Sequence, residues 1–75
     1  MNKELLNKIQ QILGTRGGEI EVEGSSMFRF VVANTKSEND FVLDSMRKVS
    51  TLVEDLKFTK YPHKGNLIVN VTVGY

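Results

Sequence analysis

The chain contains no cysteine and only one histidine, His63, so neither disulfide bonds nor a structural zinc site can hold it together. Its stability must come from packing. With 75 residues there is room for one hydrophobic core, since the smallest stable domains bury only about 60% of their unfolded surface. Hydrophobic residues make up 40% of the chain and proline occurs once, a composition typical of folded proteins. We therefore expect a single domain covering residues 1–75.

The first element is predicted to be a helix that begins at Asn2, whose side chain can cap it. The apolar residues Leu5, Ile9 and Leu13 then recur at helical spacing. Gly14 opens a glycine-rich stretch with nothing apolar to bury, so the helix should end there.

Two strands are expected next, over residues 19–23 and 27–33, because apolar and polar residues alternate in both. A hairpin in which Val22 lies opposite Phe28 places Glu21 opposite Arg29 on the other face. A shift of one residue would set Glu21 against an apolar partner. The pattern therefore predicts one register.

A long second helix is predicted to follow, with two possible N-caps: Thr35 paired with Glu38, or Ser37 paired with Asp40. Its apolar stripe would consist of Val42, Val49, Val53 and Leu56. Leu43 lies off this stripe and should be exposed. After this helix, residues 59–66 contain Pro62 and Gly65 and suggest a loop.

A third strand is expected over residues 67–73, where apolar residues alternate again. The predicted fold class is α+β: a two-layer sandwich with the order α-β-β-α-β, in which a three-stranded sheet carries two helices on one face. The last strand could lie parallel beside the second strand or antiparallel beside the first. We favour the second strand as the central one, because residues 19–23 are short and charged, as edge strands often are.

Catalytic residues are hard to find. His63 lies in the predicted loop with no acid nearby in the sequence, and the paired carboxylates, such as Asp40 with Asp44, are placed where they should be exposed. We expect no enzyme activity, no cofactor and no metal site. The sequence shows neither a membrane-spanning run nor a secretory signal, so a cytoplasmic location is expected.

One segment combines basic and aromatic residues. Residues 57–64 carry three lysines, and no acidic residue occurs from Leu56 to Tyr75. Basic side chains interleaved with aromatic ones suit the binding of single-stranded nucleic acid. The candidate residues for this alternative function are Lys57, Lys60, Tyr61, His63 and Lys64. Against it, the net charge of the whole chain is only +1.

The second candidate surface is the sheet face turned away from the helices. There the alternation of the strands should leave Val31 and Ile68 in an apolar centre with polar residues around it. The residues proposed to bind protein are Glu21, Arg29, Val31, Ile68 and Thr72. The sequence thus favours a non-enzymatic binding module that docks on a larger protein, such as an intracellular accessory protein or regulator of bacterial or phage origin. Neither the identity of the partner nor the oligomeric state follows from the sequence.

Overall fold

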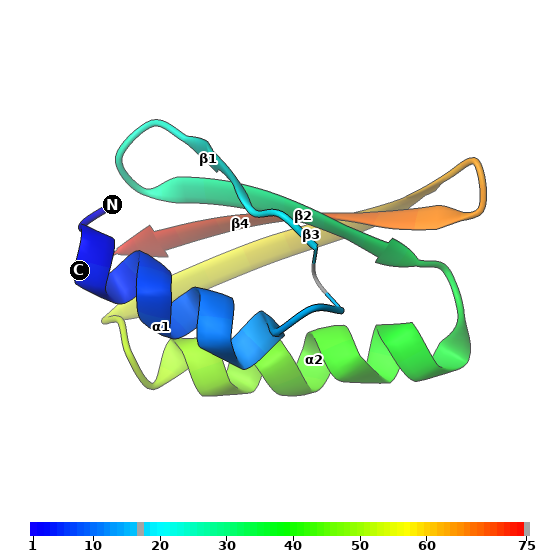
Figure 1. The fold of residues 1–75 in the computed structure, drawn as a ribbon, viewed down its shortest axis with the longest axis horizontal. Coiled ribbons are helices and arrows are strands. Elements are labelled where there is room, and N and C mark those ends of the chain that lie inside the picture. The colour runs from blue at the N-terminus through cyan, green and yellow to red at the C-terminus, as the bar shows by residue number, and fades with distance from the viewer. Residues whose placement is uncertain (17, 75) are drawn as a thin grey trace.

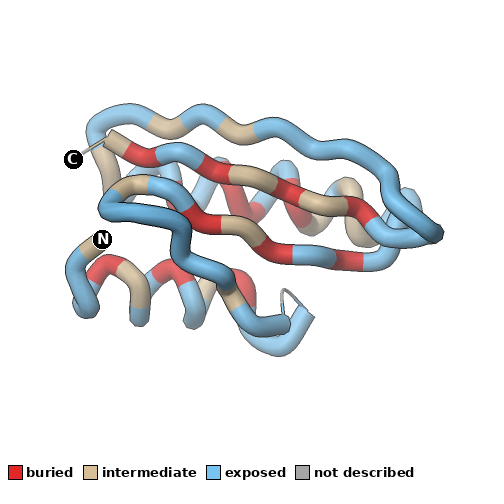
Figure 2. The backbone as a smooth tube through the Cα atoms, turned by 90° about the horizontal axis from the view of Figure 1, so that it is seen from above, coloured by how far each residue is buried: buried red, intermediate tan, exposed pale blue. Residues whose placement is uncertain are grey.

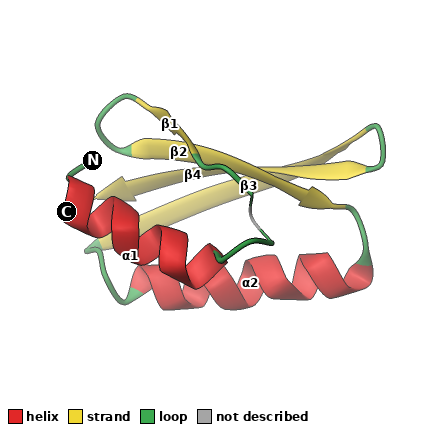
Figure 3. Ribbon diagram, viewed as in Figure 1, coloured by secondary structure: helices red, strands yellow, loops and turns green. Residues whose placement is uncertain are grey.

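The computed structural model of the chain describes residues 1–16 and 18–74 and shows two helices on one face of a four-stranded antiparallel sheet (Figure 1, Figure 3). The elements follow in the order α1 (Lys3–Leu13), β1 (Glu21–Glu23), β2 (Met27–Ala33), α2 (Lys36–Ser50), β3 (Asp55–His63) and β4 (Asn66–Gly74). The α+β class is confirmed. The prediction of three strands is wrong, because residues 55–63 form a strand of their own.

The order of strands across the sheet is β1-β2-β4-β3, and each neighbouring pair is antiparallel. The predicted pairing of Val22 with Phe28 and of Glu21 with Arg29 is confirmed, as is the position of the charged first strand at an edge. Of the predicted span 19–23, however, β1 contains only residues 21–23. The last strand lies antiparallel beside β2, an arrangement that the sequence did not suggest, because the additional strand β3 reverses the chain before β4 begins.

The second helix ends earlier than predicted, at Ser50 instead of near Leu56. The hydroxyls of Ser50 and Thr51 donate hydrogen bonds to the carbonyl oxygens of Arg47 and Lys48, at 2.6 and 2.7 Å. Such side-chain bonds compete with the backbone bonds that would continue a helix. Residues that the sequence pattern assigned to the last turns of the helix therefore lie in a turn and at the start of β3.

The predicted loop over residues 59–66 is the tip of a hairpin. Lys64 and Gly65 both have positive φ angles, 50° and 82°, which is the geometry of a two-residue type I′ turn. Pro62 lies within β3, where an edge strand tolerates proline if its missing N–H points away from the neighbouring strand. Proline and glycine thus mark the end of a strand and its turn here, not an irregular loop.

Both helices begin where side-chain oxygens accept backbone hydrogen bonds. Asn2 Oδ1 accepts from the N–H of Leu5 at 2.7 Å, which confirms the first cap. Thr35 Oγ1 accepts from the N–H of Glu38 at 3.1 Å, so of the two caps left open for the second helix the structure selects Thr35.

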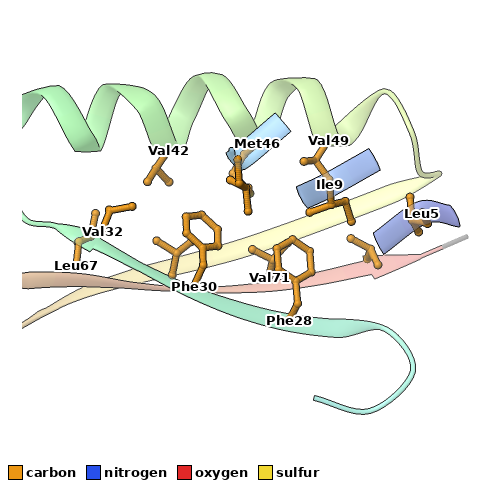
Figure 4. Close-up of a cluster of buried hydrophobic side chains, with 13 residues drawn as sticks. Leu5, Ile9, Phe28, Phe30, Val32, Val42, Met46, Val49, Leu67 and Val71 are labelled. Carbon is orange, nitrogen blue, oxygen red and sulfur yellow. The ribbon is translucent and has the colours of Figure 1, made fainter. Parts of the chain in front are cut away.

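The core lies between the helices and the sheet (Figure 4). Phe30, Val49 and Val71, from β2, α2 and β4, are 1%, 0% and 0% exposed and lie within this core. Figure 4 shows side chains of α2 and the sheet pointing toward one another across this layer. The buried apolar residues are Leu5, Ile9, Leu13, Phe28, Phe30, Val32, Val42, Met46, Val49, Leu67, Val69, Val71 and Val73. Among the residues described, no helix has the length and hydropathy needed to cross a bilayer.

Candidate functional site

The face of the sheet turned away from the helices, here called the open face, has no covering layer among the described residues (Figure 1). Because strand side chains alternate between faces, every second residue of β2 and β4 is buried and the residues between them lie on the open face (Figure 2). The open face consists of Glu21, Glu23, Met27, Arg29, Val31, Ala33, Asp55, Lys57, Thr59, Tyr61, His63, Asn66, Ile68, Asn70 and Thr72.

Three apolar side chains form a row across this face. Val31 in β2 is the register partner of Ile68 in β4, and Ile68 is in turn the partner of Tyr61 in β3. Val31 is 43% exposed and Tyr61 is 45% exposed, while Ile68 between them is half-buried. We call Val31, Ile68 and Tyr61 the apolar row. Cross-strand partners on one face lie about 4.5–5.5 Å apart at Cβ, so the three side chains can present one continuous surface.

A polar row lies next to it, made of Arg29, Asn70 and Thr59. The Arg29 guanidinium donates a short hydrogen bond to Glu21 Oε2 and lies 3.8 Å from Glu23 Oε1. The hydrogen bond to Glu21, followed by the charge of the same carboxylate, raises the pKa of Arg29 above its ordinary value. Arg29 thus remains a cation whose charge is met by two carboxylates of β1.

The residues proposed from the sequence to bind protein lie on one face. Glu21, Arg29, Val31, Ile68 and Thr72 all belong to the open face, and Thr72 is the register partner of both Met27 and Lys57. Tyr61 was not included in this set, because its segment was interpreted as a loop. Its signal in the sequence was the alternation of Leu56 and Phe58 with polar residues, which places Tyr61 on the face opposite to them.

The residues proposed for nucleic-acid binding are divided by the sheet. Lys57, Tyr61 and His63 lie on the open face. Lys60 lies on the helix side, where its Nζ donates a hydrogen bond to Asn39 Oδ1 of α2 at 2.9 Å. Lys64 lies in the turn that joins β3 to β4. The basic segment therefore does not present its charges on a single surface.

A shallow depression of about 260 Å³ lies elsewhere, at the beginning of α1. It is lined by Asn2, Glu4, Leu5, Lys8 and Leu52. Lys8 Nζ lies 3.6 Å from Glu4 Oε1, and both side chains are exposed. They form an ion pair between residues one helical turn apart. Among residues 1–16 and 18–74, no three His, Asp or Glu side chains gather in a way that could hold a metal ion.

In comparisons with known proteins, no family model and no curated protein sequence matches this chain. The chemistry of the open face is therefore the basis for a function.

Proposed function

We propose that this chain is a non-enzymatic binding module that holds a larger protein partner on the open face of its sheet. The observation that carries the proposal is the apolar row of Val31, Ile68 and Tyr61, which spans three neighbouring strands on the uncovered face. Two of these side chains keep more than two fifths of their surface in water. Full burial of such a side chain contributes about 1.5–3 kcal/mol, so the row could supply the centre of a protein interface.

The charges of the open face favour a protein over a nucleic acid. Glu21 and Glu23 engage Arg29, and Asp55 adds a third carboxylate at the opposite edge. The permanent cations on this face are Arg29 and Lys57, so a polyanion would meet no net positive surface. An apolar centre with paired charges and amide and hydroxyl groups around it is the anatomy of a protein–protein interface.

The polar row supports an oriented complex. Asn70 and Thr59 lie beside the apolar row, where they can exchange hydrogen bonds with a partner, and the carboxylates that hold Arg29 keep its guanidinium in place. Such groups fix the orientation of two proteins more than they raise affinity. We infer a small intracellular accessory protein that acts by occupying a surface of its larger partner.

The test uses a photoreactive amino acid placed at single positions of the tagged, full-length chain. Val31 is compared with Leu43, which is 42% exposed on α2 and so matches Val31 in exposure but lies away from the open face. Irradiation in bacterial lysate should yield a discrete protein adduct from position 31 and none from position 43. The adduct should persist after nuclease treatment.

Substitutions test the same surface independently. Val31→Asp and Ile68→Asp should each abolish retention of the cross-linked protein and change the free energy of unfolding by less than about 1 kcal/mol, while Leu43→Asp should leave retention unchanged. Retention by both open-face variants would contradict the proposal. Adducts that disappear with nuclease would instead identify a nucleic acid as the ligand.

A further inference from the structure

The strand β3 forms one edge of the sheet over nine residues, and among residues 1–16 and 18–74 it pairs with β4 alone. The opposite edge, β1, has three residues. In the part of the chain that the structure describes, β3 is thus the one long row of backbone groups without a second neighbouring strand, and such a row is a template for pairing with another strand.

The register shows which backbone groups point outward. In an antiparallel pair, residues alternate between those that bond to the neighbour and those that face away from it. The two-residue turn at Lys64 and Gly65 makes His63 and Asn66 a hydrogen-bonded pair. Every second residue before His63 is then also hydrogen-bonded to β4. The backbone groups of the odd-numbered residues of β3 therefore bond to β4. The N–H and C=O groups of Leu56, Phe58 and Lys60 therefore point to the free side.

Hydrogen bonds of β4 to its other neighbour agree with this count. The N–H of Val73 donates to Ser26 O at 2.8 Å, and Gly65 O accepts from the N–H of Asn34 at 3.0 Å. The odd-numbered residues of β4 thus bond to β2, which leaves its even-numbered residues for β3. Pro62 occupies an even position of β3, so its missing N–H removes no bond between β3 and β4.

Charge is distributed unevenly along this edge. Both acidic residues, Glu54 and Asp55, lie at its beginning, followed by Lys57, and its end carries Lys60, His63 and Lys64 without an acidic residue. Two copies of β3 placed side by side in parallel would align like charges. Placed antiparallel, the acidic end of one copy meets the basic end of the other, and opposite charges across neighbouring strands stabilise pairing.

We propose that two copies of this chain pair antiparallel along β3, about a two-fold axis at Thr59, and form one eight-stranded sheet. In this register Asp55 lies opposite His63 of the second copy, and the two Thr59 residues lie opposite each other. Leu56, Phe58 and Lys60 supply the N–H donors of the new backbone hydrogen bonds, while Pro62, opposite Leu56 of the second copy, contributes only its C=O. Phe58, which is only half-buried at this edge, gains cover from Lys60 of the second copy. Assembly stops at two chains, since only the short strand β1 remains at each outer edge.

The first test measures mass in solution. Sedimentation of the wild-type chain over a range of concentrations should show a species of twice the 8.5 kDa chain mass. Lys60→Pro removes an N–H that no bond to β4 uses, and should raise the dimer dissociation constant about tenfold, because two hydrogen bonds are lost per dimer. Lys60→Ala is the matched control, since it removes the same side chain and keeps the N–H. It should leave the dissociation constant within about threefold.

Amide hydrogen exchange gives a second readout. On dilution from dimer to monomer, the amides of Leu56, Phe58 and Lys60 should lose protection, while that of Thr59, which bonds to β4, should keep it. This alternation along one strand would not arise from an interface elsewhere on the molecule.

Exchanging the side chains' charges at positions 55 and 63 tests whether the two copies of β3 pair antiparallel. Asp55→Lys should weaken the dimer, and the double variant Asp55→Lys with His63→Asp should restore it. A wild-type chain that remains monomeric at millimolar concentration would overturn the proposal, as would a dimer that Lys60→Pro leaves intact. None of these substitutions changes the apolar row of Val31, Ile68 and Tyr61, so this proposal and the proposed function can fail separately.

Discussion

Phe30 and Val31 are consecutive residues of β2, and they differ in exposure because a strand directs neighbouring side chains to opposite faces. Phe30 lies in the core between α2 and the sheet, while Val31 stands in the apolar row. Phe30 therefore contributes to the stability of the fold, whereas Val31 contributes to the surface of the open face.

Truncation of each side chain should show this separation. Phe30→Ala should lower the free energy of unfolding by about 3–5 kcal/mol, because it leaves a cavity in a small core. Val31→Ala should lower it by less than about 1 kcal/mol, since the side chain is largely in water. Denaturant unfolding of the two variants measures both values. Equal losses would mean that the open face is covered within the folded chain.

At the scale of single elements, the turn between β3 and β4 depends on glycine at position 65. An added Cβ there would meet no atom within 4 Å, so any cost of substitution must come from the positive φ angle of 82°. Gly65→Ala should therefore destabilise the chain by about 1–2 kcal/mol. Lys64→Asn, at the neighbouring position with φ of 50°, should not destabilise it, because asparagine favours this conformation. Thermal unfolding of the two variants in parallel tests the assignment of the turn.

The start of α2 offers a second comparison. Thr35→Ala removes the hydroxyl that accepts the hydrogen bond from Glu38 N–H, and should cost about 1 kcal/mol of stability. Ser37→Ala, the alternative cap suggested by the sequence, should cost less than about 0.5 kcal/mol, because Ser37 lies inside the helix and is exposed. A larger loss for Ser37→Ala than for Thr35→Ala would show that the helix begins two residues later.

The first helix and the pairing of the first hairpin were predicted correctly because two independent signals agree in each. For α1, the cap at Asn2 and the spacing of apolar residues point to the same helix, and for the first hairpin the alternation in both strands selects one register. Residues 51–66 had conflicting signals. Val53 and Leu56 continued the helical stripe of α2, whereas Leu56 and Phe58 alternated as in a strand, and Pro62 suggested a break. Tertiary pairing with β4 determines the outcome, and it cannot be read from a local pattern.

On the open face, too, the residues placed correctly are those of strands that were recognised from the sequence. Arg29, Val31 and Ile68 could be placed on it from alternation within strands that were recognised. Tyr61 could not, because it depends on the strand that was missed. The pairing of Arg29 with Glu21 follows from the hairpin register, but the division of Lys57 and Lys60 between opposite faces required β3.

For the molecule as a whole, the position of β4 between β2 and β3 determines which part opens last. The odd-numbered residues Val69 and Val71 are fully buried and their strand is paired on both sides. Their amides should exchange most slowly, at a rate set by global unfolding, whereas those of Glu21–Glu23 should exchange by local opening. Exchange followed by nuclear magnetic resonance measures this order, and faster exchange in β4 than in β1 would contradict the central position of β4.

The central place of β4 also bears on how the protein is made. A nascent chain emerges from the ribosome in sequence order, so α1, β2, α2 and β3 are in solution before residues 66–74. Until then β2 and β3 have no strand between them, and Phe28 and Phe30 have no neighbours in β4 to pack beside. The four-stranded sheet therefore cannot be completed before β4, which lies between β2 and β3, has been synthesised. In that interval the apolar faces of the incomplete chain are open to chaperones.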